Sequence, residues 1–207
     1  MGSAQPKMLC LHGNRSNMMV TEMQMEVLGV AAVASCSYID GPHKSDTYDK
    51  DLEYGRTWWV EGAELKPALM EVIEYAKKHG PFDGVFGFSM GASVVTLLSD
   101  PAVLKSLGHE GGPLWRFALL ACGTDRLLSM EPALTTPIAM PSLHIHGAKD
   151  PILADAQRLL KAWDRPKLLV HPYEHALPMQ LAFAHAELLE KVTDFVKAPS
   201  YEAVAAE

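Results

Sequence analysis

Short apolar runs alternate with longer amphipathic segments along most of the chain. A run of about five apolar residues bounded by glycine, proline or polar residues is typical of a strand. The most continuous run, Phe-Ala-Leu-Leu-Ala at 117–121, suits a strand that is covered on both faces. The predicted strands are residues 7–11, 34–39, 84–88, 117–121, 142–146 and 167–171.

Helical segments are predicted between these runs, at residues 20–30, 63–79, 91–98, 154–162 and 181–196. In the second of them the apolar residues recur three, four or seven positions apart and share one face, namely Leu65, Leu69, Val72, Ile73 and Ala76. Gly80-Pro81 follows, as glycine and proline often do at the end of a helix. Strands that alternate with helices imply right-handed crossovers, so we expect an α/β fold with an open, mostly parallel sheet of about six strands and helices on both faces.

Length and composition indicate one globular domain. The chain has 207 residues, of which 48% are hydrophobic and 21% charged. This length suits a single domain with a sizeable core, and no segment is long enough for a large cap domain. We expect one domain over residues 1–197 and a flexible tail over residues 198–207, which are small and acidic.

Charge and hydropathy exclude several classes of protein. The net charge is −7, and no cluster of Lys and Arg is longer than two, so nucleic acid is not an expected partner. No apolar run approaches the roughly 20 residues of a membrane span, and the first residues lack the features of a secretory signal. Three separated cysteines without a CxxC pair suit buried, reduced thiols. We therefore expect a cytoplasmic protein; nothing in the pattern predicts its oligomeric state.

The candidate nucleophile is Ser89. In parallel sheets the chemistry lies beyond the carboxyl ends of the strands. The pentapeptide at 87–91, Gly-Phe-Ser-Met-Gly, matches G-x-S-x-G between a predicted strand and a predicted helix, as a nucleophile elbow requires. The alternative is a glycine-rich turn without chemistry. A dinucleotide-binding turn has the pattern G-x-G-x-x-G, whereas Gly84, Gly87 and Gly91 are three and four residues apart.

A serine nucleophile needs a general base, and the base needs a carboxylate that orients it. His175 follows the last predicted strand, and Asp150 follows the strand before it, so the chain order is Ser, Asp, His, as in α/β-hydrolases. Asp150 also suits the N-cap of the next helix. The rivals are other residues near strand ends, namely His43, His171, Asp125 and Asp155.

The remaining candidates concern the oxyanion and the substrate. The backbone N–H groups of Met90 and Asn14 are the expected oxyanion donors, because they follow the nucleophile and the first strand. Candidate substrate-binding residues, several of which equally suit core packing, are His12, Pro42, Arg56, Trp58 and Trp59. This chemistry needs no metal ion and no organic cofactor.

These residues lie in segments that resemble the FSH family of serine hydrolases, also called the ovarian-cancer-associated protein 2 type. The resemblance runs from about Lys7 to Phe195. It is carried by Leu9-Cys10-Leu11-His12-Gly13 with Asn17, Ile39-Asp40-Gly41-Pro42, Arg56-Thr57-Trp58-Trp59, the run from Gly80 to Ala92, the run from His144 to Pro151, and the run from His171 to Pro178. The resemblance implies a compact esterase or thioesterase without a large cap, with Ser89, Asp150 and His175 as its triad.

Two positions depart from the family pattern. Met90 stands where the family usually has Gln, and Tyr173-Glu174 stand where it usually has Gly-Gly before the catalytic histidine. We expect a serine hydrolase that cleaves carboxylic esters of small or acyl-chain substrates through an acyl-enzyme. One alternative is a thioesterase acting on acyl groups bound to coenzyme A or a carrier. The other is a hydrolase-fold binding protein that has lost its chemistry, which the Tyr173-Glu174 departure favours.

Overall fold

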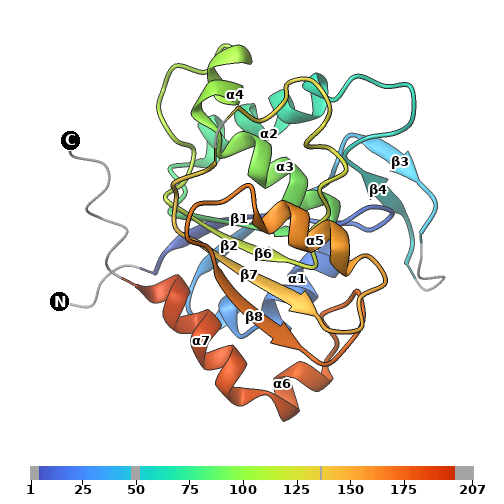
Figure 1. The fold of residues 1–207 in the computed structure, drawn as a ribbon, viewed down its shortest axis with the longest axis vertical. Coiled ribbons are helices and arrows are strands. Elements are labelled where there is room, and N and C mark those ends of the chain that lie inside the picture. Colours follow the sequence, from blue (N-terminus) through green and yellow to red (C-terminus); the bar gives the residue numbers. More distant parts are fainter. Residues whose placement is uncertain (1–4, 48–51, 136, 199–207) are drawn as a thin grey trace.

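The computed structural model describes residues 5–47, 52–135 and 137–198. Within these ranges a six-stranded sheet forms the centre of the molecule, with the order β2-β1-β5-β6-β7-β8 (Figure 1). All of its neighbouring strands pair in parallel. Its strands are β1 (Lys7–Leu11), β2 (Ser35–Ile39), β5 (Gly84–Phe88), β6 (Phe117–Ala121), β7 (Ser142–Gly147) and β8 (Lys167–His171).

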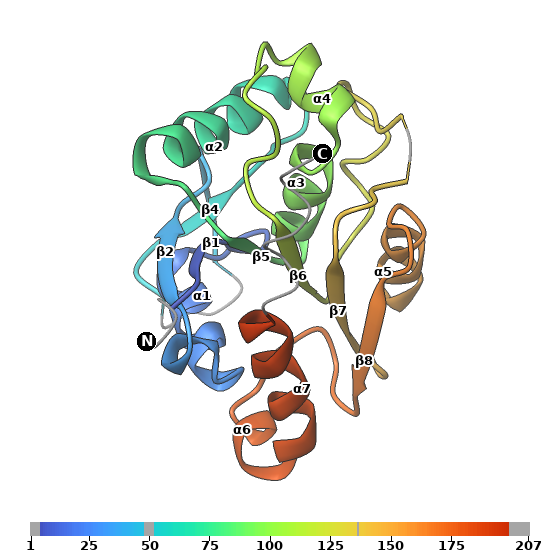
Figure 2. The same ribbon diagram turned by 90° about the vertical axis from the view of Figure 1, so that its left-hand side faces the viewer.

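Helices cover both faces of the sheet, as Figure 2 shows from the side. The helices are α1 (Met18–Val27), α2 (Lys66–His79), α3 (Met90–Leu98), α4 (Pro101–Ser106), α5 (Leu153–Leu160), α6 (Gln180–Ala184) and α7 (Ala186–Lys197). One buried cluster joins the sheet to α2, α3, α4 and α5, and a second joins its other face to α1, α6 and α7. The expected α/β-hydrolase architecture is confirmed.

The predicted strands agree closely with the sheet. Four coincide residue for residue with β1, β5, β6 and β8, and the other two differ by one residue at one end. The predicted helix 181–196 is divided, because His185 (φ −132°, ψ 48°) leaves the helical region between α6 and α7. The prediction missed α4 and the antiparallel pair β3 (His43–Ser45) and β4 (Gly55–Thr57).

Parallel strands bring their carboxyl ends to one edge of the sheet, and this determines where the loops meet. The loop after β5 lies between the loops after β1 and β6, because β1 and β6 are the neighbours of β5. Every residue of α3, which follows the β5 loop, is buried. The buried packing of α3 therefore fixes the turn that leads from β5 into this helix.

Two expectations from the sequence concern the chain ends and membranes. Of the predicted tail, residues 199–207 lie outside the described residues. No helix in the described ranges is both long and apolar enough to cross a membrane.

Candidate active site

Ser89 occupies a strained turn between β5 and α3. Its backbone has φ 53° and ψ −114°, a conformation that residues other than glycine rarely adopt and that is concentrated at functional sites. The flanking glycines permit close backbone contact. A Cβ on Gly91 would lie 2.6 Å from the carbonyl oxygen of His12, and one on Gly87 would lie 2.8 Å from the backbone of Ala92. The pentapeptide therefore forms the sharp elbow that its pattern predicts.

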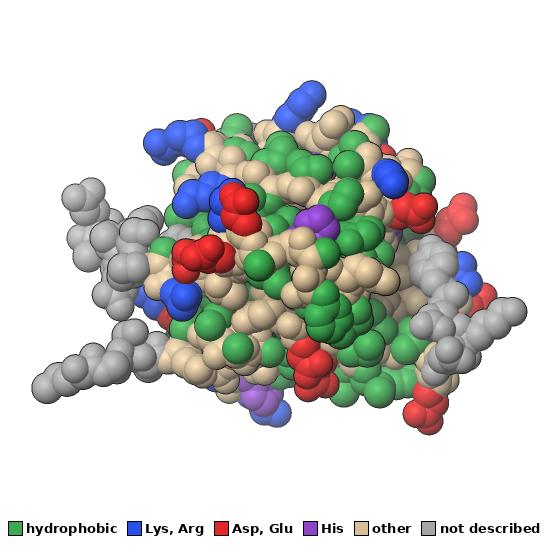
Figure 3. Space-filling view, turned by 90° about the horizontal axis from the view of Figure 1, so that it is seen from below, with side chains coloured by type: hydrophobic (Ala, Val, Ile, Leu, Met, Phe, Trp, Pro, Cys, Tyr) green, Lys and Arg blue, Asp and Glu red, His purple; other side chains and the backbone are tan. Residues whose placement is uncertain are grey.

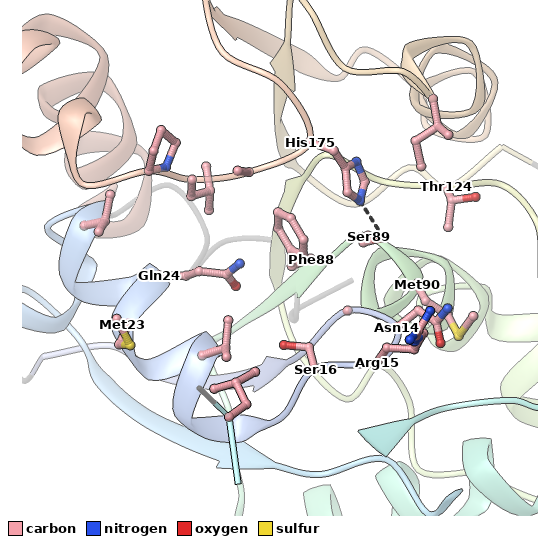
Figure 4. Close-up of a pocket in the computed structure, with 18 of the residues that line it drawn as sticks. Asn14, Arg15, Ser16, Met23, Gln24, Phe88, Ser89, Met90, Thr124 and His175 are labelled. Carbon is pink, nitrogen blue, oxygen red and sulfur yellow. Dashed lines mark hydrogen bonds between the residues drawn. The ribbon is translucent and has the colours of Figure 1, made fainter. Parts of the chain in front are cut away.

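A chain of hydrogen bonds joins Ser89 to a buried carboxylate through His175. His175 Nε2 lies 2.9 Å from Ser89 Oγ, the contact that is dashed in Figure 4. His175 Nδ1 lies 2.8 Å from Asp150 Oδ2, and the Asp150 side chain is only 1% exposed. With the proton on Nδ1 donated to Asp150, Nε2 is free to accept the proton of the serine hydroxyl.

Asp150 performs two structural tasks at once. Its Oδ1 accepts a hydrogen bond from the backbone N–H of Ile152 at 2.8 Å, which holds the turn before α5. Its Oδ2 is thereby left for His175. The rival carboxylates, Asp125 and Asp155, instead accept hydrogen bonds from Arg158 at 2.6 and 2.7 Å.

The loop that carries His175 is fixed without glycine at positions 173 and 174. The N–H of Lys149 donates to the carbonyl oxygen of Tyr173 at 3.0 Å. Neither Tyr173 nor Glu174 has a positive φ. The close approach is made instead by Gly147, where a Cβ would lie 2.2 Å from the carbonyl oxygen of Glu174. The departure from the family pattern is therefore accommodated by a glycine on the facing strand.

The two expected oxyanion donors lie beside the serine. Met90 is the first residue of α3, so its N–H has no partner within the helix. Asn14 lines the same cavity, and a Cβ on the preceding Gly13 would lie 3.1 Å from Ser89 Cβ. The loop after β1 thus lies against Ser89.

His12 stabilises the loop after β1 through two hydrogen bonds of its ring. The N–H of Gly41 donates to His12 Nε2 at 2.8 Å, so the ring proton is on Nδ1, which donates to the carbonyl oxygen of Gly13 at 2.6 Å. Burial, the largest effect, lowers the pKa of His12, which favours the neutral ring that both bonds require. Trp58 packs on this ring and donates from Nε1 to the carbonyl oxygen of His12 at 2.8 Å.

A cavity of about 740 Å³ opens at Ser89. Its apolar wall comes from α1 and from the segment after His175, with Phe88 beside the imidazole: Val20, Met23, Val27, Phe88, Leu177, Pro178 and Met179. In Figure 4, Met23 and Gln24 lie on one side of Ser89, and Asn14, Arg15, Met90 and Thr124 lie on the other. Figure 3, seen from the α6 end, shows hydrophobic side chains over much of this end of the molecule. Met179, which lines the cavity, and Phe183 of α6 are exposed hydrophobic residues.

The structure brings five predicted residues together at this cavity and leaves five others away from its lining. Ser89, His175, Met90 and Asn14 line it, and Asp150 lies behind His175. The other five, the expected substrate-binding residues, do not line it: His12, Pro42, Arg56, Trp58 and Trp59. The two tryptophans are used internally, since the indole of Trp58 is fully buried and that of Trp59 donates to Ala63 at 2.7 Å. Sequence reasoning missed the α1 wall, although the spacing of Val20, Met23 and Val27 indicates one helical face.

Cys122 lies close to Asp150 and His175. It offers a sulfur that, with one ligand atom each from Asp150 and His175, falls within 4.8 Å, a spacing at which three groups can bind a metal ion. Burial, reinforced by the charge of Asp150, raises the pKa of the thiol to about 12. Because a thiolate is the form that binds metals, and Asp150 and His175 already bond to each other, this trio is a poor metal site.

A family model described as serine hydrolase (FSH1) matches residues 1–186. An esterase of Caenorhabditis elegans is 29% identical over 221 residues, covering 94% of this chain and 95% of that protein. A hydrolase of Schizosaccharomyces pombe is 26% identical over 224 residues, covering 94% of this chain, which spans only 51% of that relative. The solved structure of a hydrolase from Thermoplasma acidophilum covers 95% of this chain and 88% of its own with a TM-score of 0.62; at 15% identity this likeness shows the fold alone.

Proposed function

This chain belongs to the FSH1 family of serine hydrolases, and we propose that it hydrolyses carboxylic esters of acyl-chain acids with Ser89 as its nucleophile. The observation that carries the proposal is the hydrogen-bonded path from the buried carboxylate of Asp150 through His175 to Ser89 Oγ. Ser89 and His175 both line a largely apolar cavity.

The reaction begins when Ser89 Oγ attacks the ester carbonyl carbon and His175 Nε2 takes the hydroxyl proton. Asp150 holds the ring in the required tautomer and stabilises the imidazolium that forms. The N–H groups of Met90 and Asn14 stabilise the negative oxygen of the tetrahedral intermediate. The carbon–oxygen bond to the alcohol then breaks, and His175 gives the proton to the leaving oxygen.

Water then hydrolyses the acyl-enzyme. His175 takes a proton from the water as its oxygen attacks the acyl carbon, and then returns that proton to Ser89 Oγ as the acid leaves. Each cycle consumes one ester and one water and releases one acid and one alcohol. A thioester follows the same steps with a thiol as the leaving group, so a panel of matched oxygen esters and thioesters of increasing chain length compares the two substrate classes.

Covalent labelling by a fluorophosphonate probe tests the proposal directly. The probe reports an activated serine and needs no knowledge of the substrate. We expect one adduct by intact mass on the wild type, mapped to Ser89, and none on Ser89→Ala. Folded wild-type protein that stays unlabelled at high probe concentration would overturn the proposal in favour of a hydrolase-fold binding protein.

Two further expectations accompany this proposal. The substrate is expected to be a small molecule, and the cytoplasmic location predicted from the sequence is to be tested by cell fractionation.

A further inference from the structure

The side of the cavity that α1 forms contains a buried carboxamide, that of Gln24, and we propose that it binds a hydroxyl group on the acyl chain of the substrate. This inference rests on the proposed ester hydrolysis and narrows its substrate class to esters of hydroxylated acyl-chain acids. Gln24 is then a specificity-determining residue, which contacts the acyl chain away from the reacting carbonyl.

Gln24 is the polar member of the α1 face that lines the cavity. Four residues of this helix line the cavity, and the other three are apolar, namely Val20, Met23 and Val27. Residues three, four and seven positions after Val20 share its face of the helix, so Gln24 lies among the apolar side chains. An acyl chain that packs along this face therefore passes the carboxamide.

The side-chain oxygen of Gln24 has no partner. The residue is only 8% exposed, and its Oε1 is enclosed without a hydrogen bond. Most buried polar atoms do have a partner, because a buried carbonyl oxygen without a donor destabilises the fold. In the free protein this oxygen therefore adds no stability through hydrogen bonding, and a ligand that supplies a donor would satisfy it.

The Gln24 side chain extends from α1 toward Phe88, which lines the same cavity (Figure 4). Because Oε1 has no hydrogen bond, rotation about the last side-chain bond can turn it into the cavity without breaking one. The same rotation exchanges the places of the oxygen, which accepts, and the NH2 group, which donates. A hydroxyl both donates and accepts, so it can pair with either end of the carboxamide. A keto or ether oxygen lacks the donor that Oε1 needs.

The position of Gln24 assigns the hydroxyl to the acyl portion of the substrate. In Figure 4, Gln24 lies with Met23 on one side of Ser89, whereas the expected oxyanion donors Asn14 and Met90 lie on the other. The Met23 side carries the apolar wall, against which the acyl chain of the proposed substrate packs. A hydroxyl on that chain is therefore the one expected to reach the carboxamide.

Butyl esters of octanoate and of its hydroxylated derivatives test the inference. The hydroxylated acids are 3-hydroxyoctanoate, 6-hydroxyoctanoate and 8-hydroxyoctanoate, and the plain octanoate ester is the reference. For the wild type we expect kcat/KM for at least one hydroxylated ester to exceed that for the reference about fivefold. A hydroxyl that does not reach Gln24 should lower kcat/KM, because it loses its water against apolar side chains.

Variants assign the preference to the carboxamide. Gln24→Met keeps an unbranched side chain but has no amide, so it should reduce the ratio of kcat/KM for the preferred hydroxylated ester to that for the plain ester to one or below. Gln157→Met is the matched control, because Gln157 of α5 is exposed and does not line the cavity. This control should keep the wild-type ratio.

Melting temperatures distinguish substrate binding from a structural role. Gln24→Met should melt no lower than the wild type, because it removes a buried polar atom without a partner. A structural role for the carboxamide would instead lower the melting temperature and change kcat/KM for the plain and hydroxylated esters alike.

The outcomes separate this inference from the proposed function. A wild type that prefers none of the hydroxylated esters, or a preference that Gln24→Met retains, contradicts the inference, while hydrolysis of the plain ester leaves the hydrolase intact. A preference for a hydroxyl on the alcohol, measured with hexyl and 6-hydroxyhexyl octanoate, also contradicts it. Absence of hydrolysis of every ester overturns this inference, and absence of fluorophosphonate labelling overturns the proposed function as well.

Discussion

The backbone of Gly147 lies directly against the carbonyl group of Glu174, so closely that a Cβ at position 147 would be 2.2 Å from that oxygen. Gly147 ends β7, and Glu174 precedes His175. The position of the imidazole therefore depends on the absence of a side chain on a neighbouring strand.

Gly147→Ala should reduce activity strongly while leaving the protein folded. The added methyl group must displace the backbone at Glu174 and with it His175, and a displacement of about 1 Å in an active site costs roughly 100-fold in rate. Ester hydrolysis and circular dichroism measure the two effects. Gly111→Ala is the control, since Gly111 is exposed, has no positive φ, and its Cβ would approach only the side chain of His109, at 3.1 Å. Equal losses in both variants would show that Gly147 has no special role.

Asp150→Asn should lower kcat by about three to four orders of magnitude. The asparagine can still accept the hydrogen bond from the N–H of Ile152, so the turn before α5 is kept, but it no longer stabilises an imidazolium. Steady-state kinetics provides the measurement. Asp164→Asn, which changes a partly exposed carboxylate paired with Arg165, should stay within a few-fold of the wild type. Near-normal turnover by Asp150→Asn would remove Asp150 from the triad.

His12→Phe should lower kcat by about 10- to 100-fold with little change in KM. A phenyl ring fills a similar volume but leaves Gly41 N–H and the carbonyl of Gly13 without their partner, so the loop that carries Asn14 loses its support. Separate determination of kcat and KM distinguishes a positioning role from a substrate-binding one. A rise in KM alone would instead favour direct contact with substrate. The exposed His79→Phe serves as control.

Acid should destabilise the fold through buried histidines. Burial, and secondarily the nearby His146, lowers the pKa of His144 from 6.5 to about 3. Between those values the unfolded chain binds a proton that the folded protein excludes, so the free energy of unfolding falls as pH falls, by about 1.4 kcal/mol per pH unit for one fully excluded proton. Burial also lowers the pKa of His146 and His171.

Urea unfolding at pH 7, 6 and 5 measures this dependence. His144→Gln should make the decline shallower by about one proton, because the substituted position no longer titrates. The solvent-exposed His79→Gln should leave it unchanged. A decline as steep in His144→Gln as in the wild type would contradict the assignment.

Much of the fold could be predicted because its inner strands are buried on both faces and so appear as continuous apolar runs. All five residues of β6 are buried, as are those of β5. The pair β3 and β4 gave no such signal, since three-residue strands such as His43–Ser45 contain too few apolar positions to show a period.

The sequence predicted those parts of the candidate site where the backbone conformation requires particular residues. It did not predict the parts that form where segments distant in the chain pack together. The elbow requires its glycines, and the chain order of Ser89, Asp150 and His175 follows from strand-end loops. The pocket wall did not follow, because it depends on how α1 packs beside residues 177–179, which are far apart in the chain. Trp58 illustrates the limit, since a large aromatic residue has the same appearance in a sequence whether it lines a cavity or, as here, supports His12 from within.

The central sheet separates the helix that follows Ser89 from the helix that helps to form the apolar wall of the cavity. The helix that begins directly after Ser89, α3, is embedded in the cluster on one face, whereas α1, which contributes to the apolar wall of the cavity, belongs to the cluster on the other. Substitutions that reshape α1 need not disturb the packing that strains Ser89. Under the proposed ester hydrolysis, we therefore expect divergent members of such a lineage to exchange one range of acyl groups for another while keeping the same turn at Ser89.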